Sequence, residues 1–265
     1  MEKRILTEIW IYPVKAMAGI RLQSARVMEK GLQYDRRWML VDESGVFMTQ
    51  RTTPPLALFK PEFRNDSFLI RFGTESVILP FDTYIKERPI DAVVWDDKVT
   101  VFEVSPEISD WVSRRLDTKC RLVAFPEENP RAVDPRYKIN PDDQVSLADG
   151  YPLLVIGQTS LDELNERLEK PIPMNRFRPN LVFKGGTAHE EDQWNHFTVG
   201  RNRFAGVKPC ARCPVPTIDQ ETAVRGKEPL TTLARYRRKD DKIYFGQNVI
   251  AIDHNEIHEG DEISF

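Results

Sequence analysis

The 265-residue sequence has only three cysteines, Cys120, Cys210 and Cys213. So small and odd a number argues against the disulfide framework that holds many small secreted domains together. Apolar runs long enough to span a bilayer are also missing, and Glu8 lies where a signal peptide would need an apolar segment. We therefore expect a mature cytoplasmic protein that does not act at a membrane.

A surplus of positive charge is missing as well. The chain has 41 acidic and 38 basic side chains, for a formal net charge of −3. This balance argues against broad binding to nucleic acid, so any anion site must be a local pocket. The glycine-rich motifs GxGxxG and GxxxxGK do not occur, which excludes the phosphate loops of the common nucleotide-binding folds.

Short β-strands dominate the expected secondary structure. Alternating or continuous apolar residues, bounded by turn residues, predict strands over residues 5–12, 37–41, 46–50, 68–72, 99–104, 152–156, 181–183, 197–207, 243–252 and 262–265. The 197–207 segment should turn at residues 200–202, and the segments 37–41 and 46–50 should form a hairpin. A chain of this kind is a β-rich α+β protein.

Three helices are expected among these strands. Ser105 and Pro106 predict the start of the first, the sequence from Ser160 to Glu163 forms a capping box for the second, and Leu230 to Ala234 suggest a short third. Residues 127–143 are rich in Pro, Asn, Asp and Arg and have no period. They predict a long loop that divides the chain into two halves.

The motif Cys210-Ala211-Arg212-Cys213 is the first indication of chemistry. A thioredoxin-like C-x-x-C normally opens a helix, which Pro214 and Pro216 disfavour here. A structural zinc site would need a second ligand pair, and the histidines offer none with suitable spacing. Two alternatives remain: a single thiolate beside Arg212, suited to a soft metal, or two inert cysteines packed in a loop.

Cations at the edges of predicted strands form a second pattern. Lys15 follows one strand, Arg36 precedes another, and Arg178 precedes a third. In a net acidic protein these side chains could gather on one phosphate-bearing ligand. Ordinary surface ion pairing is the alternative.

Several segments together indicate a family. The chain resembles the MOSC proteins, on the branch of the YcbX-like and mitochondrial amidoxime-reducing proteins, over essentially its full length. The resemblance rests on ordered segments at matching spacing: IYPVKAMAGI, GLQYDRRWMLVDESG, FMTQR, SLADGYPLLVIGQTSLDEL, NRFRPNLVF, EEDQW, VKPCARC, KEPLTTL and YFGQN.

The resemblance implies a fold and a cofactor site. Residues 1–125 would form a MOSC N-terminal β-barrel domain and residues 126–265 a MOSC β-barrel domain with a few short helices, with a molybdenum–pterin cofactor between them. Cys213 matches the cysteine that ligates molybdenum, whereas Cys210 matches an upstream cysteine that does not. The positions that match the rest of the cofactor site are Lys15, Arg36, Asp149, Gly150, Tyr151, Arg178, Asn180, Ala211 and Arg212.

The resemblance also implies an activity. Members of this branch reduce N-hydroxylated compounds to amines, so Cys213 would be catalytic as the metal ligand, with Asp149 a candidate proton donor. Relatives fused to cofactor sulfurases suggest the alternative of a cofactor carrier or sulfur-transfer module that uses a Cys213 persulfide. At the level of the whole family, an association with pyridoxal phosphate binding is a further implication.

The sequence departs from the family pattern at several positions. Ala16 stands where serine is common, and Pro214 and Pro216 predict a stiffer metal loop. YcbX-like members carry a plant-type iron–sulfur domain, but this sequence has no C-x₄-C-x₂-C run. We therefore expect electrons to come from a separate flavin or iron–sulfur reductase.

Overall fold

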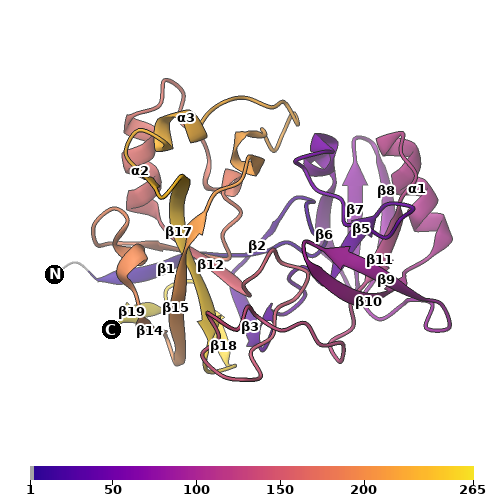
Figure 1. Ribbon diagram of the computed structural model, residues 1–265, viewed down its shortest axis with the longest axis horizontal. Helices are drawn as coiled ribbons and strands as arrows, with labels where there is room; N and C mark the ends of the chain where they lie inside the picture. The colour runs from indigo at the N-terminus through magenta and orange to yellow at the C-terminus, as the bar shows by residue number, and fades with distance from the viewer. Residues whose placement is uncertain (1–2) are drawn as a thin grey trace.

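The computed structural model describes residues 3–265, which fold into two lobes lying side by side (Figure 1). Strands predominate within that range, accompanied by three α-helices and four 3₁₀ turns. None of the helices formed by residues 3–265 combines the length and apolar character needed to cross a membrane. The expected β-rich fold with a few short helices is confirmed.

A closed barrel forms the first lobe. Its ring is closed because β12 pairs with β13 in parallel and with β17 in antiparallel orientation. The seven strands in ring order are β12 (Leu153–Gly157), β13 (Leu181–Lys184), β1 (Arg4–Ile11), β19 (Glu262–Ser264), β14 (His196–Val199), β15 (Asn202–Ala211) and β17 (Lys242–Ala251). Two short strands extend the ring, β2 (Ile20–Leu22) on β1 and β16 (Arg238–Lys239) on β17.

The N-terminal strand lies in this barrel, far along the chain from its neighbours. β1 pairs with β13 and β19, and β18 (Glu256–His258) pairs with β3 (Ser24–Met28), which in turn pairs with β4 (Gly31–Leu32). The division into residues 1–125 and 126–265 stays a prediction. Strands from the first of these ranges, β1 and β3, pair with strands from the second, so the two ranges are not structurally separate.

The second lobe contains two antiparallel sheets and a helix. One sheet has the order β5 (Trp38–Val41), β11 (Arg121–Ala124), β10 (Asp97–Glu103) and β9 (Pro89–Val94), and the other has the order β6 (Lys60–Arg64), β7 (Ser67–Phe72) and β8 (Glu75–Pro80). A 3₁₀ turn, η1 (Pro54–Leu58), precedes β6. Helix α1 (Pro106–Leu116) lies at the outer edge of this lobe (Figure 1).

The start of α1 follows the sequence prediction. The Ser105 Oγ accepts a hydrogen bond from the Ile108 amide at 3.2 Å, and Pro106 occupies the first turn, where its missing N–H is not needed. Ile108, Trp111 and Val112 are buried on one face. The helix ends at Asp117, whose left-handed conformation breaks the helical path.

Two local predictions are wrong. Helix α2 (Gln158–Glu166) has Gly157 and not Ser160 as its N-cap, and the Ser160 hydroxyl donates instead to the buried Glu191 carboxylate at 2.9 Å. Residues 46–50 form only isolated bridges, from Phe47 to Val41 and from Val46 to Val93, so they are not a full strand. The third helix is confirmed as α3 (Leu230–Leu233).

The long loop between the halves is confirmed, since the structure describes no strand between Ala124 and Leu153. A buried cation orders it. The Arg131 guanidinium donates to the carbonyls of Ser146 and Ala148 at 2.6 and 2.5 Å and to Asp97 Oδ2 at 2.9 Å. One side chain therefore satisfies backbone carbonyls that a strand would otherwise pair.

Candidate functional site

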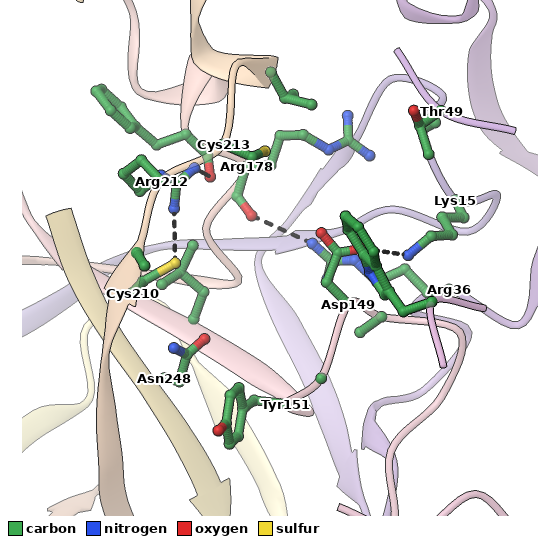
Figure 2. Close-up of a pocket in the computed structure, with 18 of the residues that line it drawn as sticks. Lys15, Arg36, Thr49, Asp149, Tyr151, Arg178, Cys210, Arg212, Cys213 and Asn248 are labelled. Carbon is green, nitrogen blue, oxygen red and sulfur yellow. Dashed lines mark hydrogen bonds and ion pairs between the residues drawn. The ribbon is translucent and has the colours of Figure 1, made fainter. Parts of the chain in front are cut away.

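A cavity of about 530 Å³ lies where the two lobes meet (Figure 2). All ten residues that the sequence assigned to a cofactor site line it: Lys15, Arg36, Asp149, Gly150, Tyr151, Arg178, Asn180, Ala211, Arg212 and Cys213. They come from the end of β1, the approach to β5, the loop before β12, the approach to β13 and the end of β15.

The cavity is electropositive although the chain is net acidic. Its walls carry six cationic side chains and two carboxylates, Asp96 and Asp149. Lys15, Arg36 and Arg178 line the same space, and their shared binding of one phosphate-bearing ligand stays a prediction. A concave site with this excess of cations favours an anionic ligand.

Lys15 is buried and hydrogen-bonds to other segments of the chain. Its amide donates to the Trp38 carbonyl at 2.7 Å, and its Nζ donates to the Leu147 carbonyl at 2.7 Å and to Asp149 Oδ1 at 2.5 Å. Burial lowers the pKa of Lys15 to about 8, against the opposing pull of the Asp149 charge. Lys15 is therefore a cation that can lose its proton near neutral pH.

Asp149 is the partner of that ammonium. Desolvation acts to raise the pKa of Asp149, but the charge and hydrogen bond of Lys15 outweigh it and hold this pKa well below its usual range. Asp149 is ionised at neutral pH and has no proton to give. The proton-donor role expected for Asp149 finds no support here, and the geometry favours a role in holding Lys15.

The titration of Lys15 leads to a measurable prediction for the cofactor-free protein. Sulfate, which does not itself titrate in this range, should bind most tightly below pH 8 and lose up to about tenfold in affinity per pH unit above it. The sign follows because the neutral amine that forms above the lowered pKa cannot attract an anion. Calorimetric titration from pH 6.5 to 9.5 at constant ionic strength measures this.

Lys15→Arg is the matched control for this titration, because a guanidinium stays charged throughout the range. Its sulfate affinity should change little with pH. A wild-type affinity that is equally flat would contradict the assignment of Lys15 to the anion site.

Arg36 and Asn180 form one braced unit. The Arg36 Nη1 donates to the Asp35 carboxylate and, at 3.1 Å, to Asn180 Oδ1, while its Nη2 donates to the Arg178 carbonyl at 3.3 Å. Asn180 is 1% exposed, and its side chain also accepts from the Leu154 amide and donates to the Trp10 carbonyl. Asn180 therefore fixes the arginine relative to β1 and β12.

Arg178 has more freedom to bind a ligand. Its Nη1 donates to the Met17 carbonyl at 2.6 Å, the only hydrogen bond of this side chain within residues 3–265. Burial lowers the pKa of Arg178 to about 10, so it remains a cation at neutral pH. Most of its hydrogen-bonding capacity is unused.

Backbone strain accumulates around the cavity. Four of its non-glycine residues adopt left-handed φ angles: Ala16 at 71°, Arg36 at 52°, Trp95 at 59° and Arg178 at 55°. Such conformations are uncommon and persist only where the surrounding contacts impose them. Their concentration here indicates that the surrounding fold imposes these backbone conformations and so fixes the direction of the side chains.

The two cysteines of the C-x-x-C motif differ in their surroundings. Cys210 lies in β15 and accepts a hydrogen bond from Arg212 Nη1 at 3.1 Å (Figure 2). Cys213 follows the strand, lines the cavity and makes no hydrogen bond to any residue from 3 to 265. The Arg212 guanidinium lines the cavity with Cys213, but its hydrogen bonds go to Cys210 and the Phe177 carbonyl, so its role beside a ligating Cys213 stays a prediction.

The segment after Cys213 is held in place. Pro214 leads into the 3₁₀ turn η4 (Val215–Thr217), where Thr217 Oγ1 donates to the Pro214 carbonyl at 2.8 Å. Arg176, in η2 (Met174–Arg176), donates from Nε to the Pro216 carbonyl at 2.8 Å. These bonds fit the stiff loop that the prolines predict.

The structure also bears on the competing interpretations of the cysteines. No α-helix starts at the motif. Within the part of the chain that is described, no three His, Cys, Asp or Glu side chains are grouped to hold a metal. A metal at Cys213 would thus need most of its ligands from elsewhere.

Sequence reasoning did not assign a role to several lining residues: Thr49, Gln50, Arg51, Trp95, Lys208 and Asn248. Arg51 lies over the Trp95 ring at 4.2 Å and Lys208 over the Tyr137 ring at 4.4 Å, and neither forms an ion pair among the described residues. Five of the six lie in the segments FMTQR, VKPCARC and YFGQN, which carry the family resemblance. Those segments were the signal by which these five residues could have been identified. Trp95 lies outside all the segments that carry the resemblance.

Comparison with known proteins identifies two domains. The family model for the MOSC domain matches residues 142–264, and that for the MOSC N-terminal beta barrel domain matches residues 4–119. The chain is 32% identical over 244 residues to mitochondrial amidoxime-reducing component 1 of Mus musculus, covering 89% of this chain and 72% of that protein. It is 32% identical over 251 residues to mitochondrial amidoxime reducing component 2 of Bos taurus, covering 89% and 73%.

A relative with a different name matches equally well. The chain is 31% identical over 264 residues to the molybdenum cofactor sulfurase of Danio rerio, covering 91% of this chain but only 31% of the sulfurase. The similarity therefore extends to proteins with two different activities in their names.

Proposed function

This chain belongs to the MOSC family, and on that premise we propose that it is a molybdenum-cofactor-dependent oxidoreductase that reduces N-hydroxylated compounds to amines. The names of its relatives support a function related to the molybdenum cofactor. The observation that carries the proposal is a single cavity that combines six cations with an unpaired thiol.

The residues present fit such a cofactor. A cavity of about 530 Å³ is within the usual range for a bound small molecule. Lys15, Arg36 and Arg178 supply the charge-assisted donors that a phosphate prefers, and Cys213 supplies the soft thiolate that suits molybdenum. When bound, the cofactor would supply a redox-active metal centre able to take an oxygen atom from an N–OH group.

The protein's own contribution is to bind, orient and hold charge. The three cations would fix the phosphate, with Lys15 kept protonated by the added negative charge. Arg212, tied to Cys210 and Phe177, leaves the Cys213 sulfur free of hydrogen bonds. The braces at Arg176 and Asn180 would keep the thiol and the cation cluster at a constant separation.

The electron source is proposed to be a separate flavin or iron–sulfur protein. The described cysteines are three free thiols, and they do not form a cluster suited to iron. The cytoplasmic location expected from the sequence stays a prediction, since the amidoxime-reducing relatives are named as mitochondrial.

The competing candidate is a cofactor carrier or sulfur-transfer module. Similarity to the molybdenum cofactor sulfurase favours it, and an accessible thiol without hydrogen-bonding partners could carry a persulfide. This candidate predicts a persulfide on Cys213 and little reductase activity even when the cavity is filled.

The test is to express the chain in a host competent for molybdenum-cofactor synthesis and to assay it directly. We expect about one molybdenum per chain, pterin fluorescence after oxidation, and conversion of benzamidoxime to benzamidine with a reduced viologen dye. A loaded protein that does not reduce benzamidoxime but carries sulfane sulfur would favour the transfer module. A well-folded protein without molybdenum or pterin would refute the reductase, and a persulfide on its Cys213 would then favour the transfer module.

A further inference from the structure

Tyr12 holds an unusual position between two arginines. It follows β1 directly, and its side chain is buried, with the residue only 1% exposed. The guanidinium carbon of Arg36 lies 4.6 Å from the centre of its ring and that of Arg178 lies 4.1 Å from it. One aromatic ring thus contacts both of the arginines assigned to the anion site.

The ring is tied to the chain segments that carry these arginines. The Tyr12 amide donates to Asp35 Oδ1 at 2.7 Å, and its carbonyl accepts from the Arg36 amide at 2.9 Å. Its hydroxyl donates to the Pro179 carbonyl at 3.1 Å. Tyr12 is therefore bonded to a residue adjacent to each arginine and to Arg36 itself.

The two guanidinium groups repel each other, so holding both at one ring requires compensating negative charge nearby. The negative face of an aromatic ring attracts a cation, most strongly where water is excluded. The Asp35 carboxylate, which is fully buried, neutralises part of the charge of Arg36. Arg178 has no carboxylate in an ion pair with it among residues 3–265, and its guanidinium instead contacts the Tyr12 ring and the Met17 carbonyl.

The edge of the Tyr12 ring packs closely against Gly19, where there is no room for a side chain. A Cβ atom added at Gly19 would lie 2.6 Å from Tyr12 Cε1, closer than real Cβ contacts allow. A side chain at position 19 would displace the ring from its place beside the arginines. Glycine at that position is therefore part of the same arrangement.

We propose that Tyr12 is a positioning residue that holds Arg36 and Arg178 together, as a two-armed clamp for one anionic group on the ligand. This inference deepens the proposed function, in which that group is the cofactor phosphate, and it rests on that function for the identity of the ligand. The clamp itself predicts anion binding whether or not molybdenum is present.

The experiment separates the ring face from the hydroxyl. Tyr12→Phe keeps the face and loses the Pro179 bond, whereas Tyr12→Leu loses both. We expect Tyr12→Phe to bind sulfate in its cofactor-free form with near wild-type affinity, and Tyr12→Leu to bind about tenfold more weakly. In protein loaded with cofactor, Tyr12→Leu should also release molybdenum faster on dilution.

Phe204→Leu is the matched control, because Phe204 is a fully buried aromatic residue in β15 of the barrel that does not line the cavity. It should lower the melting temperature and leave the sulfate affinity of the folded protein unchanged. If Tyr12→Leu does not fold, Gly19→Ala carries the test, and its displaced ring should weaken sulfate binding with the tyrosine still present.

The outcomes distinguish the clamp from the proposed function. A folded Tyr12→Leu protein with wild-type sulfate affinity and molybdenum retention overturns the clamp. If Tyr12→Leu does not fold, wild-type sulfate affinity in Gly19→Ala overturns it instead. Weakened sulfate binding in a protein that never takes up molybdenum supports the clamp and overturns the proposed cofactor.

Discussion

Cys213→Ser is expected to yield a folded protein that has lost molybdenum and the reduction of benzamidoxime, while Cys210→Ser keeps both. Cys213 lines the cavity with an unpaired thiol, so its sulfur is available to a metal. A serine hydroxyl is a harder and far more basic donor, and it would remain protonated where a thiol ionises. Loss of a ligand should lower metal retention by roughly 100-fold or more, beyond what outer contacts contribute.

Cys210→Ser is the matched control, since it makes the same change three residues away in the same strand and loop. Cys210 accepts a hydrogen bond from Arg212, and serine can accept that bond too. We expect near wild-type molybdenum content. Metal analysis of both proteins, normalised to the folded fraction, measures the difference.

A reversed result would reassign the ligand. If Cys210→Ser lost the metal and Cys213→Ser kept it, the thiol beside the guanidinium would be the ligand. If both kept molybdenum, neither sulfur would bind it. Equal activity in Cys213→Ser would remove the main support for the proposed reductase chemistry.

The local elements of this fold could be predicted because their signals lie within a few residues. Ser105 caps α1 through Ile108, and the strands show apolar patterns in their own sequence. The closure of the barrel could not be predicted, because it depends on β12 pairing with β17 almost a hundred residues away. Ser160 was misassigned for the same reason, since its partner Glu191 is distant in the sequence.

The candidate site could also be predicted only in part from the sequence. Ordered motifs located the ten residues that line the cavity, but not the direction of each side chain. Arg212 was expected beside Cys213, and the fold gives its guanidinium two hydrogen-bonding partners, Cys210 and the Phe177 carbonyl, that the sequence did not indicate. Trp95 and Arg51 come together only through the fold, so their contact carried no signal in the sequence.

Arg178→Ala and Arg36→Ala are each expected to weaken retention of the cofactor by roughly 10- to 100-fold, as the loss of one or two charge-assisted bonds would. The two variants should differ in stability. The Arg178 side chain has one hydrogen bond within residues 3–265, so its loss should affect the ligand most. Arg36 also bonds Asp35, Asn180 and the Arg178 carbonyl, so its removal leaves a buried carboxylate unpaired and should lower the melting temperature as well.

Arg37→Ala provides the control that separates these effects. Arg37 is the neighbour of Arg36 and is equally cationic, but its guanidinium contacts Glu127 and the Asp35 carbonyl outside the cavity. It is 4% exposed, so its loss should destabilise the fold without changing molybdenum per folded chain. Molybdenum content and thermal unfolding, measured on all three variants, separate the effect of each arginine on cofactor retention from its effect on fold stability. If Arg37→Ala emptied the cavity as fully as Arg178→Ala, metal loss would reflect instability alone, and the phosphate role of the cluster would fail.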